Sequence, residues 1–422
     1  MTGTQHCSSA PCTPSRLAET LIKYASKPWR TVLSLHSGTS TNGVDSALIR
    51  VSGSGEATRV EFVAHSTYEF PPEVREKLLE MHEKTATIEK VSQANFLLGE
   101  IFAKAARRIV DENGLSFGDV DVIGSSGQIG YHVRAGQNLE DIWFGDTEIP
   151  SAIDLGEGAV IAERTGVCTV ANMRIRDIAA GGQGNPLVTY GDWVLFRHPT
   201  KSRIIQNIGG IANPTVLPAG AGLDKVQAFD TGPGNMVIDG VVKRLFRGKL
   251  SYDKNGDIAR RGRVNDLLLS ELMRHPYVLR KPPKTTGREV FGEHFIQSVL
   301  DRARELSLSN EDLVATVTAF SAESIAYNYR QFVLPTTPID EILLCGGGSH
   351  NKTLVGFLEE RLHSVPIKTV EVCGIPVDAR EVVAVGVIAD STMLGHSGNV
   401  PSASGARRRV VMGCIFPGSY EL

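Results

Sequence analysis

Residues 31–51 read TVLSLHSGTSTNGVDSALIRV, and this stretch decides the fold. Short apolar runs on either side of a turn rich in glycine, serine and threonine predict two strands joined by a tight loop. Residues 202–218, SRIIQNIGGIANPTVLP, follow the same plan of strand, glycine turn and strand. The repetition predicts two related lobes, each with a glycine turn between its first two strands. Ordinary hairpins with glycine at the bend would give the same pattern, and for either turn alone this simpler interpretation is favoured.

Two later segments also place glycines directly after a strand. Residues 228–246, AFDTGPGNMVIDGVVKRLF, predict a strand, a turn and a helix, whereas residues 340–362, DEILLCGGGSHNKTLVGFLEERL, predict a buried strand, three glycines and a helix. Backbone without side chains lets another molecule approach closely, and the N–H groups of such turns bind phosphate. Four such turns together favour a nucleotide-binding α/β protein over loops that merely contain glycine.

Composition limits the classes of partner. The chain has 422 residues, of which 41% are hydrophobic and 22% are charged, as is typical of a globular protein with two or three domains. Its 44 Lys and Arg against 47 Asp and Glu give a net charge of −3, so we expect neither nucleic acid nor an anionic membrane as a partner. The six scattered cysteines are interpreted as reduced thiols rather than as a zinc site.

The start of the chain gives no sign of export. Residues 1–30 lack the apolar core of a secretory signal, and no apolar run of the sequence is long enough to span a bilayer. We therefore expect a cytoplasmic protein.

Several long motifs, all in one order, resemble the anhydro-N-acetylmuramic acid kinases and the related fungal levoglucosan kinases. They extend from about Leu33 to about Ala389 and include SGTSTNGVD, GSSGQ, GEGAVIAERTG, MRIRDIAAGGQGNPL, NIGGIAN, FDTGPGNMVID, YDKNGDIARRG, PPKTTGREVF, CGGGSHN and IPVDAREVVAVGVIA. The resemblance implies the two-lobed, ribonuclease H-like fold of the actin-like ATPases, which sugar kinases and heat-shock chaperones share, with ATP and Mg²⁺ in a central nucleotide cleft. It also implies a reaction in which water opens a 1,6-anhydro sugar and ATP phosphorylates the freed O6. The partners would then be ATP and a small anhydrosugar, and the family is compatible with a homodimer.

On this basis the chain divides into four segments. We expect a flexible extension (1–30), an N-terminal lobe with the acceptor-sugar residues (31–200), a C-terminal lobe with nucleotide-binding residues (201–395) and a C-terminal tail (396–422).

Carried over by position, the resemblance implies two sets of binding residues. The nucleotide set contains Gly38, Thr39, Ser40, Asn42, Gly43 and Asp45 in the first phosphate loop, Asn207, Gly209 and Gly210 in the second, Asp230, Gly232 and Gly234 in the following turn, and Gly346, Gly347 and Gly348 beside the adenosine. The acceptor set contains Ser126, Gln128, Arg174 and Glu289, and the catalytic set contains Arg174, Glu289 and the position of Asn172. Asp45, an acid next to the first glycine turn, is the expected ligand of Mg²⁺.

Asn172 departs from the family pattern. The family has an acid there, in a motif that reads Asp-Phe-Arg where this chain reads Asn-Met-Arg, and that acid is the family's general base. An amide can orient water but has no basic lone pair near neutral pH with which to accept a proton. The family also has an acid at Asn42 and a histidine at Ser126, so the resemblance implies that three ionisable groups are replaced by neutral ones.

These replacements leave alternatives open, of which the simplest is tolerated drift in a working kinase with an altered acceptor. The main interpretation is an anhydrosugar kinase with impaired catalysis, because loss of general-base help typically costs a factor of about 10²–10⁴ in rate. The alternative is a catalytically inactive pseudokinase that binds nucleotide or sugar for regulation, or a scaffold that uses the two lobes as a clamp. Asp154 and Glu157 are further acids that could approach this loop, but the sequence does not show their positions.

Overall fold

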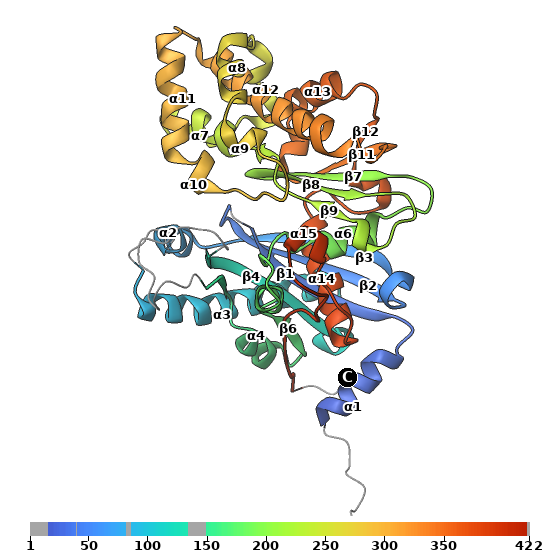
Figure 1. The fold of residues 1–422 in the computed structure, drawn as a ribbon. Coiled ribbons are helices and arrows are strands. Elements are labelled where there is room, and N and C mark those ends of the chain that lie inside the picture. Colours follow the sequence, from blue (N-terminus) through green and yellow to red (C-terminus); the bar gives the residue numbers. More distant parts are fainter. Residues whose placement is uncertain (1–15, 39, 82–85, 134–148, 420–422) are drawn as a thin grey trace, which may run out of the picture.

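The computed structural model describes residues 16–38, 40–81, 86–133 and 149–419. Two lobes stand one above the other, each built around a β-sheet (Figure 1). Ahead of the first lobe, α1 (Arg16–Ser26) packs against the body of the protein through Tyr24, whose hydroxyl donates a hydrogen bond of 2.7 Å to Asp390. The predicted flexible extension therefore contains a docked helix, while residues 1–15 lie outside the described residues.

The first lobe contains a seven-stranded mixed sheet. Its strand order is β13-β6-β4-β1-β2-β3, with β5 paired to β4. Strand β1 runs antiparallel to β2 and parallel to β4. The strands are β1 (Arg30–Ser37), β2 (Gly43–Ser52), β3 (Arg59–Glu69), β4 (Val122–Val133), β5 (Ser151–Leu155), β6 (Thr169–Ala171) and β13 (Cys414–Phe416).

The second lobe repeats this plan. Its sheet has the order β10-β8-β7-β11-β12, with β9 paired to β8, and β7 runs antiparallel to β8 and parallel to β11. The strands are β7 (Arg203–Ile208), β8 (Ile211–Leu217), β9 (Gln227–Ala228), β10 (Gly232–Pro233), β11 (Glu341–Cys345) and β12 (Ile367–Thr369). The five strands β3-β2-β1-β4-β6 thus correspond in order and direction to β10-β8-β7-β11-β12, which confirms the repeat that the two strand–glycine–strand segments predicted.

Helices cover both faces of the first sheet because neighbouring side chains of a strand point to opposite sides. Leu33 packs in one core cluster with α3 (Ile88–Glu112) and α4 (Gly158–Thr165), while Val32 packs in another with α6 (Thr189–Phe196) and α14 (Arg380–Met393). Helix α4 ends at Gly166, whose φ of 74° is the left-handed conformation expected of a helix-ending glycine.

One core cluster extends from the first sheet to the second. It joins residues of β1 and β2 to α6 and α14 and continues to Ile205, Leu217 and Leu343 on the second sheet. The opposite face of the second sheet packs against α12 (Asn310–Asn328) and α13 (Lys352–Arg361). The remaining helices are α2 (Pro72–Met81), α5 (Ile175–Ala179), α7 (Met236–Leu245), α8 (Asp266–Met273), α9 (Pro276–Leu279), α10 (Arg288–Phe291), α11 (Glu293–Glu305) and α15 (Pro401–Ser404).

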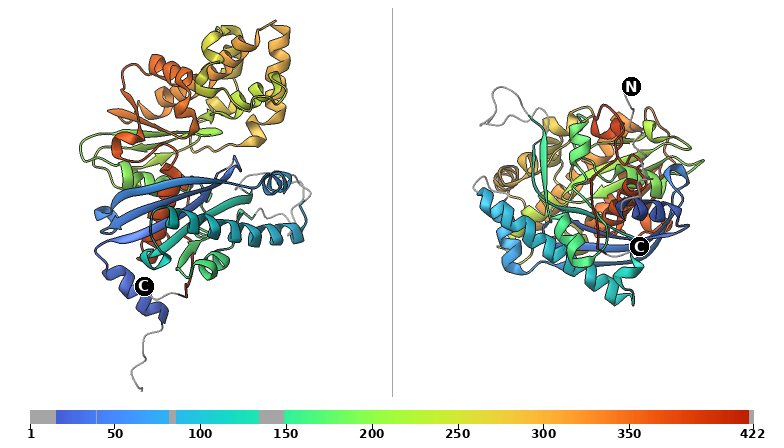
Figure 2. Two further views of the ribbon diagram at one scale, coloured as in Figure 1. Left: turned by 180° about the vertical axis from the view of Figure 1, so that it is seen from behind. Right: turned by 90° about the horizontal axis from the view of Figure 1, so that it is seen from below.

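The end of the chain returns to the first lobe, as the red segments in Figure 2 show. Helix α14 belongs to the segment 201–395 but packs on β1, β2 and β4, and β13, from the tail, pairs with β6. The lobes therefore follow the two sheets rather than a single boundary at residue 200. None of the described helices is long and apolar enough to cross a membrane.

Candidate active site between the lobes

The first glycine loop connects β1 to β2. Its backbone turns through a hydrogen bond from the amide of Thr41 to the carbonyl of Gly38 (3.1 Å), and Ser40 donates to the Oδ1 of Asn42 (2.8 Å). Gly43 has no room for a side chain, because a Cβ there would collide with the carbonyl of Tyr68. Of the residues predicted for this loop, Thr39 lies outside the described residues.

Asp45 lies on β2 directly after this loop, opposite His36 in the register. Its Oδ1 accepts a hydrogen bond of 2.6 Å from Thr67 and lies 3.8 Å from the Nε2 of His65. The described residues contain no group of three or more His, Cys, Asp or Glu side chains able to hold a metal ion. A metal carried by phosphates needs only one or two protein carboxylates, so Asp45 is compatible with such an ion.

The other predicted glycine turns converge in the second lobe. The amides of Gly234 and Asn235 donate to the carbonyls of Gly210 (2.9 Å) and Gly209 (2.8 Å), which ties the 232–234 turn to the second loop. A Cβ at Gly346 would collide with the Oδ1 of Asn207, and one at Gly348 would collide with Ile208. The structure therefore brings residues 207–210, 232–235 and 346–348 into direct contact.

The carboxylate of Asp230 is hydrogen-bonded to the segment 285–286. Its Oδ2 accepts hydrogen bonds from the Oγ1 of Thr285 and the amide of Thr286, both 2.8 Å long. In the same segment Lys284 is buried, and its ammonium donates to the carbonyls of Tyr277 and Val278. Burial lowers the pKa of Lys284 to about 8, against the attraction of Asp230.

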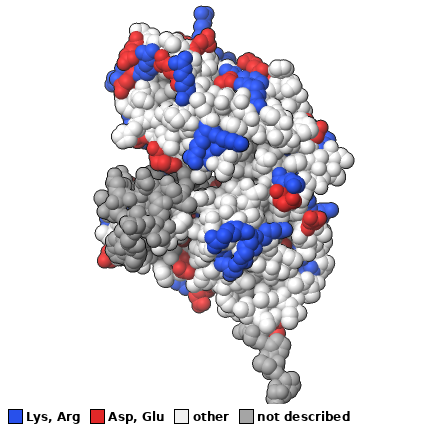
Figure 3. Space-filling view, viewed as in Figure 1, with Lys and Arg blue, Asp and Glu red and all other residues white. Residues whose placement is uncertain are grey.

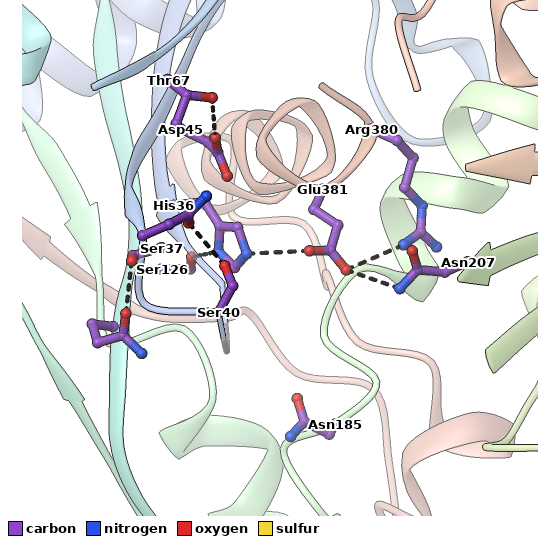
Figure 4. A network of polar contacts seen from close by, with 12 residues as sticks. His36, Ser37, Ser40, Asp45, Thr67, Ser126, Asn185, Asn207, Arg380 and Glu381 are labelled. Atoms are coloured by element: carbon purple, nitrogen blue, oxygen red, sulfur yellow. Dashed lines mark hydrogen bonds and ion pairs between the residues drawn. The ribbon is translucent and has the colours of Figure 1, made fainter. Parts of the chain in front are cut away.

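A chain of polar contacts runs from the first sheet to the second phosphate loop (Figure 4). The Oγ of Ser126, on β4, lies 2.7 Å from the Nδ1 of His36, on β1. The Nε2 of His36 lies 3.3 Å from a carboxylate oxygen of Glu381, at the start of α14. The other oxygen of Glu381 accepts a hydrogen bond of 3.3 Å from the Nδ2 of Asn207, at the end of β7. The two lobes are thus connected at the level of both glycine loops.

The charges around Glu381 keep it ionised. Burial among protein atoms opposes the charge, although 40% of the side-chain surface is still exposed to solvent. The hydrogen bond and charge of His36, with the charges of Arg380 and Arg174, outweigh burial and lower the pKa of Glu381 to about 2.

Next to Glu381 in the sequence, Arg380 forms a bidentate ion pair with Asp192 in the core between the lobes. Burial raises the pKa of Asp192 above its usual range, whereas attraction to Asp192 outweighs burial and raises the pKa of Arg380. Because the bidentate geometry favours the charged forms, we take both groups to be ionised.

Asn172 lies between β6 and α5, half-buried, with a φ of 55°. Asparagine and aspartate tolerate this left-handed conformation better than most residues. Two residues later, the buried side chain of Arg174 donates from Nη1 to Asp154 (2.7 Å) and to the carbonyl of Ser126 (3.4 Å), and from Nε to the Oδ1 of Asn185 (3.4 Å). The structure thus brings the loop of Asn172 and Arg174 to the turn of Ser126.

The remaining acceptor residues differ in position. Ser126 and Gln128 are both buried, and the Oε1 of Gln128 lies 2.6 Å from the hydroxyl of Ser37, so both side chains are held against β1. Glu289 is exposed on α10 in the second lobe. Its role as a sugar contact stays a prediction.

Sequence reasoning missed His36 and Glu381. The motif IPVDAREVVAVGVIA contained a signal, because it places two charged residues, Arg380 and Glu381, directly before an apolar run. Charged residues are rarely buried unless they are paired or functional.

Two surface hollows are lined by none of the predicted site residues. One, of about 570 Å³, is bordered by Arg176, His396, Arg408 and Arg409, and the other, of about 330 Å³, lies between α8 and α11. On the face drawn in Figure 3, acidic and basic side chains are interspersed over the upper lobe, and a group of basic side chains stands on the lower lobe.

The doubled sheet, with a glycine turn between the first two strands of each copy, is the ribonuclease H-like plan of the actin-like ATPases. The chain belongs to the anhydro-N-acetylmuramic acid kinase family, whose model matches residues 30–418.

Relatives cover nearly the whole chain. The anhydro-N-acetylmuramic acid kinase of Caldanaerobacter subterraneus subsp. tengcongensis is 46% identical over 396 residues, which are 94% of this chain and 99% of the relative. That of Clostridioides difficile is 39% identical over 384 residues, which are 91% of this chain and 97% of the relative. Among solved structures, component A of (R)-2-hydroxyglutaryl-CoA dehydratase from Acidaminococcus fermentans aligns with 86% of this chain and 99% of that chain, at 12% identity and a TM-score of 0.43.

Proposed function

We propose that this protein is an ATP-dependent kinase that opens a 1,6-anhydro sugar and phosphorylates it at O6. Membership of the family and the contacts among the three glycine turns of the second lobe support the proposal. The observation that carries it is the polar chain Ser126–His36–Glu381–Asn207, which joins the predicted acceptor residues to the second phosphate loop. A cytoplasmic location suits a protein that uses ATP.

The nucleotide would lie along the glycine turns. The backbone at Gly209, Gly210 and Gly347 has room beside it, since a Cβ there would meet no atom closer than 3.4 Å. Backbone N–H groups in such turns bind phosphate oxygens without the obstruction of a side chain. When bound with ATP, Mg²⁺ would offset negative charge on the phosphates, and Asp45 is the residue we propose to hold it.

The acceptor sugar would lie against the loop of Asn172 and Arg174. A guanidinium in a low-dielectric setting can orient sugar oxygens and offset charge that develops on them. The amide of Asn172 can position water but cannot take its proton. We therefore propose that turnover is impaired, by up to the factor of about 10²–10⁴ that a general base supplies.

The second candidate is a regulatory pseudokinase or scaffold that binds nucleotide or sugar without turnover. The neutral side chain of Asn172 in the place of the base is the observation that favours it.

Two measurements decide between them. Thermal unfolding with ATP and Mg²⁺ tests nucleotide binding, since a ligand present at 100 times its Kd stabilises the folded state by about 2.7 kcal/mol. Transfer of labelled phosphate from ATP to levoglucosan and to anhydro-N-acetylmuramic acid tests the enzyme. Stabilisation by ATP together with phosphate transfer supports the kinase. Stabilisation by ATP without transfer to any anhydrosugar supports the pseudokinase, and the absence of stabilisation by ATP supports the scaffold.

A further inference from the structure

The larger of the two surface hollows is lined largely by basic side chains. Its volume is about 570 Å³, and its residues come from three separate parts of the chain. Arg176 lies on α5, and His396 and Ser397 follow the end of α14. Arg408 and Arg409 lie between α15 and β13. The other lining residues are Gly395, Val410 and Val411. Among the described residues, the lining therefore has three guanidinium groups and no carboxylate.

These three arginines lack the acidic partner that an exposed arginine can have elsewhere on this protein. The guanidinium of Arg164, for example, lies 2.7 Å from a carboxylate oxygen of Glu100. Arg176, Arg408 and Arg409 are also exposed, but they form no ion pair with any residue in the part of the chain that the structure describes. Like charges that are held close together repel one another, and a bound anion would remove that repulsion.

Buried hydrogen bonds fix the backbone that carries these arginines. The amide of Val410 donates to the Oδ1 of Asn399 (2.8 Å). The Nδ2 of Asn399 donates to the carbonyl of Arg408 (3.2 Å) and to the Oδ1 of Asp177 on α5 (2.8 Å). Asn399 and Asp177 are only 4% and 1% exposed. The three segments are thus held together before any ligand arrives, which lowers the cost of ordering them around one.

The charge and the size of the hollow suit a small phosphate ester. Guanidinium groups donate paired N–H groups that match phosphate oxygens, and a phosphate monoester carries a charge of about −1.5 to −2 at pH 7. A volume of about 570 Å³ is that of a site for a small molecule. The net charge of −3 gives the chain no broad attraction for a polyanion such as nucleic acid.

We propose that this hollow is a binding site for a phosphate monoester such as a sugar phosphate. Arg176, Arg408 and Arg409 bind the phosphate oxygens, and the lining includes none of the residues of the glycine turns. The site adjoins the acceptor loop, because the carboxylate of Asp177 also accepts a hydrogen bond of 2.9 Å from the amide of Gly184. The inference does not depend on the proposed function, since its test measures binding alone.

The test is calorimetric titration of the full chain with glucose 6-phosphate at low ionic strength, where exposed charges are least screened. The parent should bind the ester at millimolar concentration or below. Inorganic phosphate should displace the ester and glucose should not, because the arginines recognise the phosphate group. Kd should rise at least about tenfold in the double variant Arg408→Gln/Arg409→Gln and in Arg176→Gln, because each loses charge-assisted hydrogen bonds. The matched control, Arg260→Gln/Arg261→Gln, removes an adjacent exposed pair from the second lobe and should bind like the parent.

Three results would overturn the inference. The first is the absence of binding by the parent, and the second is displacement by glucose, which would place the ester in a sugar site. The third is an unchanged Kd in the arginine variants, which would place the ester outside the hollow. An unchanged midpoint of urea unfolding verifies that the variants fold, as expected for exposed side chains. Since the two arginine variants alter separate segments, either one decides if the other misfolds. None of these results bears on the proposed function, which is tested with ATP and anhydrosugars.

Discussion

The exchange Asn172→Asp returns a carboxylate to the loop between β6 and α5. The backbone there has a φ of 55°, which aspartate adopts about as readily as asparagine, and the side chain is half-buried. The change adds no atom beyond an oxygen in place of a nitrogen. We therefore expect the variant to fold like the parent and to differ in the chemical step.

The expected gain follows from what a general base contributes to the chemical step. A well-placed general base supplies a factor of about 10²–10⁴, or about 3–5 kcal/mol of transition-state stabilisation. The amide of Asn172 already orients the water in the parent, so only part of this factor is gained. We expect kcat to rise about ten- to a hundredfold, that is by about 1.4–2.7 kcal/mol.

The assay is ADP release, measured at saturating ATP and anhydrosugar. KM for ATP should not change, because residue 172 follows β6 in the first lobe, whereas the glycine turns at 207–210 and 346–348 lie at the ends of β7 and β11 in the second. The control Asn172→Ala removes the amide without adding an acid, and its kcat should not exceed that of the parent. If Asn172→Asp has the same kcat as the parent, or a lower one, the account of position 172 as a missing base is refuted.

Three further predictions concern the phosphate loop, the core and pH. Gly348→Ala should weaken ATP binding at least about tenfold in calorimetry, because its Cβ would collide with Ile208 in the second phosphate loop. The control Gly347→Ala should bind ATP like the parent, because the nearest atom to its Cβ would be 3.9 Å away. Asp192→Ala should lower the free energy of urea unfolding by about 3–5 kcal/mol, because it removes the bidentate partner of the buried Arg380 and leaves only Glu381, 3.7 Å away, to offset its charge; a loss below 1 kcal/mol would contradict this. Because the pKa of Glu381 is lowered to about 2, its ionised carboxylate stabilises the fold above its ordinary pKa of 4.5, and this contribution is lost as pH falls toward 2. The difference in free energy of unfolding between the parent and Glu381→Gln should therefore be present at pH 6 and shrink steadily below pH 4.5.

The fold was predictable because its signals are local. The apolar runs of β1, β2, β7 and β8 and the glycines between them lie within segments of about twenty residues, where strand and turn preferences act. The position of α14 was not predictable in this way. Its residues Arg380–Met393 are almost all buried, so their pattern indicates a buried helix without indicating which sheet covers it.

The site was predictable only where it is built from backbone. Glycine turns reveal themselves in sequence because few other residues allow such conformations. Glu381 is different, since its partners His36 and Asn207 come from distant parts of the chain and only the packing of α14 between the lobes brings them together. The ion pair between Arg174 and Asp154 likewise depends on where Arg174 points, which no local pattern records.

Comparison by position also misjudges which groups the site has lost. The imidazole that the family pattern places at residue 126 is present here on the adjacent strand, where His36 lies 2.7 Å from the hydroxyl of Ser126. Near the loop of residue 172, the carboxylate of Asp154 accepts a hydrogen bond from Arg174, the arginine of that loop. Proton transfer depends on where a basic atom lies and not on which residue number supplies it. Two of the three neutral replacements are therefore accompanied by an ionisable group nearby, and this arrangement favours a kinase with a rearranged acceptor site over a protein that only binds.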